Sequence, residues 1–120
     1  MNAIDIKGTE DKPTIVLDKA AGKFELSGRS LPEDAAEFYN PILKWLAEYA
    51  AAPNPTTELN IKLEYFNTAS SKLLLDILHT VEPIKGLKVT WFHFDDDEDM
   101  QEAGQEFSEL VEVPFEFKTY

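Results

Sequence analysis

The stretch that decides the fold is Glu58-Leu59-Asn60-Ile61-Lys62-Leu63-Glu64-Tyr65-Phe66-Asn67-Thr68-Ala69-Ser70-Ser71-Lys72. Residues 58–66 alternate between polar and apolar side chains, which predicts a half-buried strand. The buried face of this strand is expected to carry Leu59, Ile61, Leu63 and Tyr65. Beyond Lys72, apolar side chains recur at helical spacing, which predicts an amphipathic helix that ends at Pro83 and Gly86. A cluster of Asn, Thr and Ser side chains therefore marks the join of a strand and a helix.

Upstream of this join, residues 14–18 and 23–28 predict an antiparallel hairpin that turns at Ala21-Gly22, and Ile4 and Ile6 predict a short edge strand. Ser30 followed by Glu33 fits a capping box, with Ser30 as the cap of the next helix. The buried stripe of that helix is expected to contain Ala35, Phe38, Tyr39, Ile42, Leu43, Leu46 and Tyr49. Pro41 lies inside the stripe and predicts a kink or a break there.

Downstream, residues 87–94 predict a strand that is nearly apolar at its end, which indicates cover on both faces. Met100, Ala103, Phe107 and Leu110 form a last helical stripe. Residues 113–117 predict a final strand, for which Pro114 favours an edge position. Strands joined through helices pair in parallel. The predicted fold is therefore α/β, a single domain over residues 1–120, with a mixed sheet of five to six strands and three to four helices.

Charge and composition narrow the classes of function. Of the 120 residues, 11 are Lys or Arg and 23 are Asp or Glu, which gives a net charge of −12. A field of that sign repels nucleic acid and anionic lipid, so we expect neither nucleic acid nor a membrane as a partner. The chain has no cysteine, which excludes disulfides and fits a cytoplasmic protein. The start of the chain lacks the basic and apolar segments of a signal peptide.

The hydroxyl cluster at the join has two interpretations. Asn67, Thr68 and Ser70 are all residue types that cap helices, each at about 1 kcal/mol, and spacing alone favours capping. The alternative is a phosphorylation site, since a helix start has free N–H groups and a positive dipole that accept a phosphate. Such a phosphate would disturb the fold little and would act mainly on a partner docked there, because burying a dianion is costly. The position also lies at the edge where open α/β sheets bind ligands.

Three blocks of sequence resemble one known family. They are residues 28–34 continuing through 38–46, residues 63–68 with Ser70-Ser71-Lys72, and residues 95–100 continuing through Glu102-Ala103-Gly104. Together they make the chain similar to the SiaC-type regulatory phosphoproteins from Thr14 to Phe117. One departure is Ala69, where the family pattern has Ser. Because Thr68 is retained, this departure leaves the main motif intact.

The resemblance implies a fold related to the STAS domains of anti-sigma-factor antagonists, and a partner-switching role without catalysis. In that family the Thr matching Thr68 is phosphorylated by a dedicated serine/threonine kinase, and a PP2C-like phosphatase removes the phosphate. The unphosphorylated form binds and activates a diguanylate cyclase, which promotes aggregation and biofilm formation. Thr68 is thus the expected phosphorylation site. The alternative function is a STAS-like module that binds a small anion or a nucleotide without a phosphoswitch.

The remaining candidate residues are expected to contact partners. They are Asn67, Ser70, Ser71, Lys72, Asp96 and Asp97. Lys72 follows Thr68 by one helical turn and is therefore placed to lie near a phosphate. The run 95–99 reads first as a solvated acidic loop and helix start, and otherwise as a docking site. Its spacing imitates a calcium-binding loop, but Met100 occupies the position that needs glycine. No nucleophile–base pair, phosphate-binding glycine loop or metal-ligand spacing is present, so we expect no cofactor and no enzyme.

Overall fold

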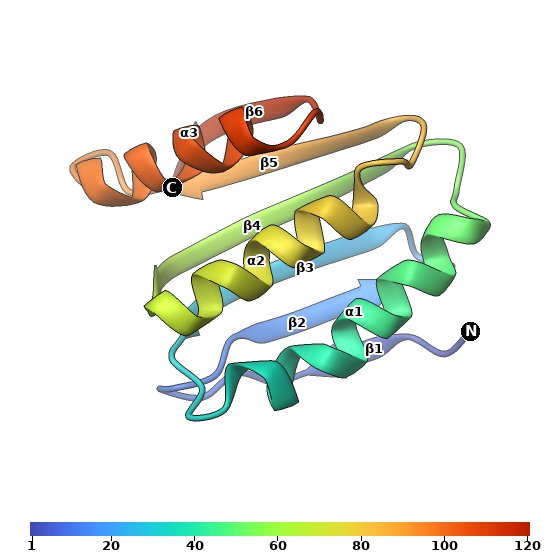
Figure 1. Ribbon diagram of the computed structural model, residues 1–120, viewed down its shortest axis with the longest axis horizontal. Helices are drawn as coiled ribbons and strands as arrows, with labels where there is room; N and C mark the ends of the chain where they lie inside the picture. The colour runs from blue at the N-terminus through green and yellow to red at the C-terminus, as the bar shows by residue number, and fades with distance from the viewer.

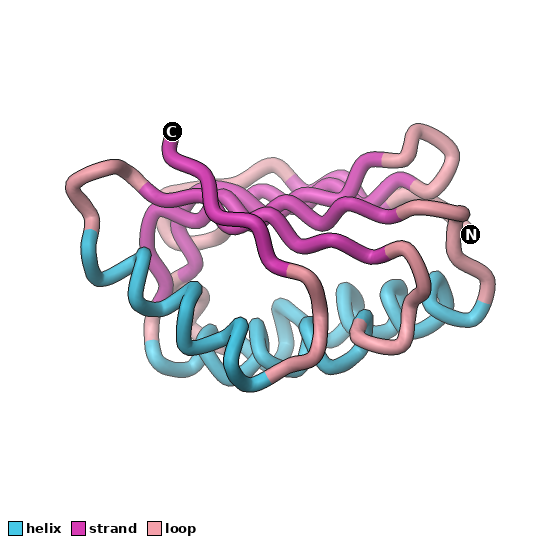
Figure 2. Tube along the Cα trace, turned by 90° about the horizontal axis from the view of Figure 1, so that it is seen from above, coloured by secondary structure: helices cyan, strands magenta, loops and turns pink.

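Two layers make up the molecule, and all three helices cover the same face of one sheet (Figures 1 and 2). The computed structural model describes residues 1–120. The elements are β1 (Ile4–Ile6), β2 (Thr14–Asp18), β3 (Lys23–Ser30), α1 (Ala35–Ala51), β4 (Thr57–Phe66), α2 (Thr68–Val81), β5 (Leu87–His93), α3 (Glu98–Leu110) and β6 (Phe115–Thr119). The predicted α/β class is confirmed, and the six strands and three helices lie within the predicted ranges. No helix has both the length and the apolar character needed to cross a membrane.

The six strands lie side by side in the order in which they occur in the chain. β1 pairs with β2 and β2 with β3 in antiparallel fashion, whereas β3–β4, β4–β5 and β5–β6 are parallel. The N-terminal hairpin, its edge strand and the edge position of β6 after Pro114 are thus confirmed. Because three consecutive crossovers return over one face, α2 lies between α1 and α3 (Figure 1).

The predicted alternation of β4 holds only as far as Leu63. Leu59, Ile61 and Leu63 are buried beneath the helices, but Tyr65 is 50% exposed, so its predicted place in the core was wrong. The cause is an irregularity in the register: Gly28 pairs with Leu63 while Arg29 pairs with Tyr65, so β4 has one residue more than β3 here. An extra residue reverses the alternation of sides. Phe66 consequently faces inward, where its ring contacts those of Trp91 and Phe107.

The Ser30 cap and a break at Pro41, both expected for α1, were wrong. The helix is capped by Asp34, whose Oδ1 accepts a hydrogen bond of 3.0 Å from the N–H of Glu37. Ser30 is instead the buried last residue of β3. Pro41 does not break the helix, which continues from Ala35 to Ala51. Pro41 and Glu37, whose carbonyl loses its helical partner, are both exposed, so water can bond that carbonyl.

The predicted cover on both faces of the apolar end of β5 comes from helices on one face only, because no helix lies on the second face of the sheet (Figure 2). Side chains cover it in part. The ring of Phe92 lies 5.9 Å from that of Tyr120, and the ammonium of Lys62 lies 4.9 Å from the centre of the Phe92 ring. Phe94 packs on Tyr120 at 4.5 Å and remains 43% exposed. The apolar run thus forms a small aromatic cluster near the C-terminus.

Candidate functional site

Thr68 is the first residue of α2 and follows the C-terminal end of the parallel strand β4 (Figure 1). Of the residues predicted to cap this helix, Asn67 is the one that does so: its Oδ1 accepts a hydrogen bond of 2.8 Å from the N–H of Ser70. The N–H of Asn67 donates in turn to the carbonyl oxygen of Ser30 at 3.0 Å. Hydrogen bonds therefore tie the helix start to the end of β3. Because Asn67 makes the capping contact, the Thr68 side chain is not needed for it.

A chain of buried hydroxyl groups lies behind this helix start. The Ser30 Oγ donates to the Ser70 Oγ at 2.8 Å, and the Ser70 Oγ donates to the Ser30 carbonyl at 3.1 Å. Because the single proton on the Ser30 Oγ is used in this way, the Tyr39 hydroxyl is the donor in its hydrogen bond with Ser30. Burial raises the pKa of Tyr39 to about 12, against the opposing effect of the Ser30 hydrogen bond. The phenol therefore stays protonated and keeps its donor role at neutral pH.

The three hydroxyl residues of the join are placed very differently. Ser70 is fully buried, and its hydroxyl is bonded within the protein. Ser71 is half-buried, while Thr68 is exposed and its side chain makes no hydrogen bond within the chain. The Thr68 side chain is therefore open to solvent in the folded chain. Ser70, predicted as a partner contact, serves the interior instead.

Thr68 and Lys72 lie on the walls of two grooves, one on each side of α2. The α1–α2 groove has a volume of about 1310 Å³ and is lined by Asp11, Lys12, Pro32, Glu33, Asp34, Ala35, Ala36, Glu37, Phe38, Thr68, Ala69, Lys72 and Leu73. The α2–α3 groove has a volume of about 400 Å³ and is lined by Phe66, Thr68, Ser71, Lys72, Leu75, Ala103, Glu106, Phe107 and Leu110. Ser71 and Lys72 thus lie on the same surface as Thr68.

The charges around Thr68 are mostly negative. Asp11, Glu33, Asp34 and Glu37 line the α1–α2 groove, against the two cations Lys12 and Lys72. This balance disfavours a free anion or nucleotide as the ligand of that groove. On the other side, no Lys or Arg occurs between Val89 and Phe117, although Asp and Glu are frequent there. A partner surface that is basic would complement both sides of α2.

The acidic run 95–99 has a structural part at the start of α3. Asp97 is the N-cap, since its Oδ1 accepts a hydrogen bond of 3.0 Å from the N–H of Met100. Glu98 and Asp99 lie in the first turn, where carboxylates complement the helix dipole. Asp96 is exposed in the preceding loop, and neither Asp96 nor Asp97 lines a groove beside Thr68. No group of acidic or His side chains is arranged to hold a metal ion.

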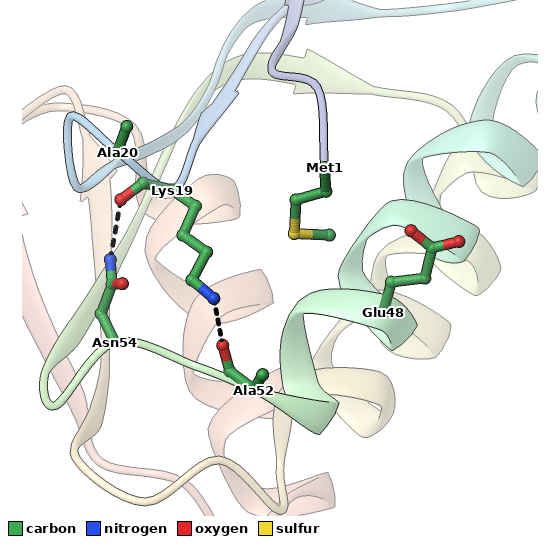
Figure 3. A pocket seen from close by; sticks show the side chains of 6 residues that line it. All are labelled: Met1, Lys19, Ala20, Glu48, Ala52 and Asn54. Atoms are coloured by element: carbon green, nitrogen blue, oxygen red, sulfur yellow. Dashed lines mark hydrogen bonds between the residues drawn. The ribbon is translucent and has the colours of Figure 1, made fainter.

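A third hollow, of about 560 Å³, lies at the opposite end of the molecule, between the β2–β3 turn and the end of α1 (Figure 3). Two of its polar side chains hold these two segments together. The ammonium of Lys19 donates to the carbonyl of Ala52 at 2.6 Å, and the Nδ2 of Asn54 donates to the carbonyl of Lys19 at 2.9 Å. Lys19 thereby supplies the C-terminal cation that the last turn of α1 lacks. These contacts join the β2–β3 turn to the end of α1, which is a structural role.

The sequence of this chain matches the family described as SiaC family regulatory phosphoprotein over residues 6–120. The chain belongs to this family. An uncharacterized protein of Pseudomonas aeruginosa (strain UCBPP-PA14) is 29% identical to it, over 100% of this chain and 98% of that protein. The predicted resemblance is thereby confirmed, and with it a regulatory class of protein.

Solved structures of this family have the same fold. SiaC of Pseudomonas aeruginosa is similar with a TM-score of 0.89 and 27% identity, covering 100% of both chains. The crystal structure of the diguanylate cyclase SiaD in complex with its activator SiaC from Pseudomonas aeruginosa contains a chain with a TM-score of 0.90 and 29% identity, over 98% of this chain and 99% of that chain. Apo-SiaC from the same organism has a TM-score of 0.88 and 30% identity, over 98% and 99%.

Sequence reasoning missed the contribution of Ser30 and Tyr39 to this site. Ser30 was interpreted as a helix cap because of Glu33, and Tyr39 as an ordinary core residue. The only available signal was that each of these hydroxyl-bearing side chains falls on the apolar face of its element. Their meeting with Ser70 depends on the parallel pairing of β3 with β4, which brings Ser30 opposite Phe66 and next to the start of α2. A contact across 40 residues of sequence has no local signature.

Proposed function

We propose that this chain is an adaptor controlled by phosphorylation of Thr68, which binds and activates a diguanylate cyclase when Thr68 is unmodified. A dedicated serine/threonine kinase adds the phosphate and a PP2C-like phosphatase removes it. The observation that carries the proposal is the exposure of the Thr68 hydroxyl, at a helix start whose other hydroxyl groups are buried or half-buried. Membership of a family of regulatory phosphoproteins supports it.

The local structure favours a switch that acts on binding and leaves the fold intact. A phosphate on Thr68 adds about −1.5 to −2 charge at the positive end of the α2 dipole, with Lys72 one turn further along the helix. The hydrogen bonds that hold the helix start belong to Asn67 and Ser70, so the modification breaks none of them. A partner that covers Thr68 would have to remove water from the new charge, which is costly. Phosphorylation is therefore expected to release the partner.

The proposed partner follows from the likeness to SiaC, which in Pseudomonas aeruginosa forms a complex with the diguanylate cyclase SiaD as its activator. The similarity extends over the entire fold, which supports a corresponding partner for this chain. Through that partner the chain would control the synthesis of cyclic di-GMP and, with it, aggregation and biofilm formation.

The first test is phosphorylation by the kinase of the source organism with ATP. Intact-mass measurement is expected to show the addition of one phosphate to the wild type and to Ser71→Ala, and none to Thr68→Ala. Ser71→Ala is the matched control because it removes a neighbouring hydroxyl of the same helix turn. Unchanged phosphorylation of Thr68→Ala would falsify the assignment of the site.

The second test compares the binding of Thr68→Asp and Thr68→Asn to the cyclase of the source organism by calorimetry. Thr68→Asp is expected to raise the Kd about tenfold, because a buried carboxylate must be desolvated. The Asn side chain of Thr68→Asn has nearly the same shape as Asp but no charge, so this variant is expected to bind like the wild type. Equal weakening by both variants would attribute the effect to shape, and the electrostatic mechanism would then be wrong.

A further inference from the structure

The α2–α3 groove differs from the α1–α2 groove in its apolar floor. Five of its nine lining residues are apolar, and one of them, Leu110, is 59% exposed. Among the large apolar side chains that the fold leaves in solvent, Leu110 is the most exposed. The α1–α2 groove is more polar, since four carboxylates and two Lys side chains line it. An apolar floor within a polar rim is the anatomy of a stable protein interface.

The rim of the α2–α3 groove also selects the charge of an occupant. Glu106 lies in the groove itself, and the adjoining turns of α3 carry Glu102 and Glu109 with no compensating cation on that helix. Only Lys72 contributes a positive charge, at the Thr68 end. A segment with one apolar side flanked by Lys or Arg would fit both the floor and the rim. A groove between two helices is a common seat for an amphipathic helix.

We infer that the α2–α3 groove is the surface on which the diguanylate cyclase docks, through an amphipathic basic segment whose apolar side chains cover Leu110. This inference rests on the proposed function and adds to it the surface and the chemistry of the partner. The cyclase is favoured over the kinase because activation requires a lasting complex, and lasting complexes bury an apolar core. A kinase needs only brief access to Thr68.

The position of Thr68 on the wall of this groove explains why a phosphate would act on the complex. The segment that covers Leu110 runs between α2 and α3 and ends against Thr68, Ser71 and Lys72. A phosphate there falls at the edge of the buried area, where it occupies space and must lose its water when the segment docks, which is costly. The same segment can therefore be released without any movement of the helices.

Binding of the cyclase of the source organism to variants of the full chain tests this surface. Leu110→Ser is expected to raise the Kd at least about tenfold through lost apolar contact. Glu106→Lys is expected to slow association and to reduce the dependence of association on salt. The matched controls are Tyr65→Ser, an exposed aromatic residue outside the groove, and Glu48→Lys, the same charge change at the exposed hollow at the opposite end of the molecule. Both controls are expected to change the Kd about twofold at most.

The outcomes separate this inference from the proposed function. A wild-type chain that does not bind the cyclase overturns both. Wild-type binding that Leu110→Ser leaves unchanged overturns the docking surface alone, as does a Leu110→Ser variant that loses only its phosphorylation by the kinase. A photo-crosslinking residue at position 110 gives an independent measurement. It is expected to capture a Lys- or Arg-rich amphipathic peptide of the cyclase, and capture of an acidic peptide would contradict the inference.

Discussion

Ser70 shows how a single side chain can determine the accessibility of its neighbour. It accepts a hydrogen bond from Ser30, donates one to the Ser30 carbonyl and provides the N–H that Asn67 caps. These contacts fix the first turn of α2 so that the side chain one residue beyond the cap, Thr68, faces solvent. The exposure of Thr68 is thus set by hydrogen bonds within the protein.

Ser70→Ala is expected to lower the free energy of unfolding by about 1 to 3 kcal/mol, since it leaves the buried Ser30 hydroxyl without an acceptor. Denaturant titration measures this loss. Ser71→Ala serves as the control with an expected change within about 0.5 kcal/mol, because that side chain is half-buried and forms no side-chain hydrogen bond. Equal stability of the two variants would show that the hydroxyl chain contributes nothing.

Because Tyr39 is buried, the free energy of unfolding is expected to depend on its ionisation at high pH. In the unfolded chain a tyrosine loses its proton near pH 10, whereas the pKa of folded Tyr39 is about 12. The unfolded state therefore loses its proton first. The contribution of Tyr39 to the free energy of unfolding is fully present below pH 10. It falls by about 1.4 kcal/mol per pH unit between pH 10 and 12.

Unfolding of Tyr39→Phe over the same pH range provides the comparison. The free energy of unfolding of the variant is expected to decline less steeply with pH. The remaining tyrosine contribution comes from Tyr120, because burial also raises the pKa of Tyr120 to about 12. Tyrosinate absorbance of the folded protein should lose one late component in this variant. Identical slopes for wild type and variant would indicate that Tyr39 is hydrated in solution.

Among the elements, α3 depends on a close approach to the sheet. Gly104 faces Trp91 of β5, and a Cβ at this position would come within 2.6 Å of the indole ring. The same indole donates a hydrogen bond of 2.9 Å from its Nε1 to the carbonyl of Met100 one turn earlier. Trp91 therefore holds α3 at two points, and with it the α3 wall of the α2–α3 groove.

Gly104→Ala is expected to destabilise the protein by about 1 to 3 kcal/mol through overpacking, although alanine favours a helix by about 1 kcal/mol. Thermal unfolding measures the net effect, and near-ultraviolet circular dichroism reports the indole environment. Gln105→Ala, at the exposed neighbouring position, is the control and is expected to be neutral or slightly stabilising. A more stable Gly104→Ala protein would mean that α3 can shift away from Trp91 at no cost.

The sequence predicted elements better than it predicted their irregularities. Periodicity identified the three helices, the hairpin and the edge strand, because side-chain spacing reflects which face is buried. It could not predict the extra residue at Glu64–Tyr65, since a bulge is defined by the pairing with β3. The misplaced Ser30 cap and the unbroken helix at Pro41 have similar causes, namely a competing cap at Asp34 and a solvent-exposed ring.

The candidate site was predictable only in part, because it too depends on contacts between distant parts of the chain. Residues adjacent in sequence, such as Thr68 and Lys72, could be grouped by helical spacing alone. The two grooves could not be predicted, because α1 and α3 reach α2 from elements far away in the chain. Asp96 and Asp97 were predicted as partner contacts from composition and lie outside both grooves.

On the scale of the whole molecule, α2 separates two surfaces that share Thr68 and Lys72. If the cyclase occupies the α2–α3 groove, it covers part of the residue that the kinase must reach. Saturating cyclase is accordingly expected to slow phosphorylation of the wild type at least about tenfold, as measured by initial rates of phosphate incorporation. Leu110→Ser, which binds the cyclase weakly, should lose this protection. Equal rates with and without the cyclase would mean that both enzymes bind at once.

This shared position has a consequence for the duration of a signal. Under the proposed function, a kinase that is switched on would modify only the free molecules at once, while those in complex would be modified after they dissociate. The lifetime of the complex, set by how deeply Leu110 is buried, would then determine how long the cyclase stays active after the stimulus ends. Exchanging Leu110 for smaller or larger apolar residues would shorten or lengthen that delay without any change to the kinase or the phosphatase.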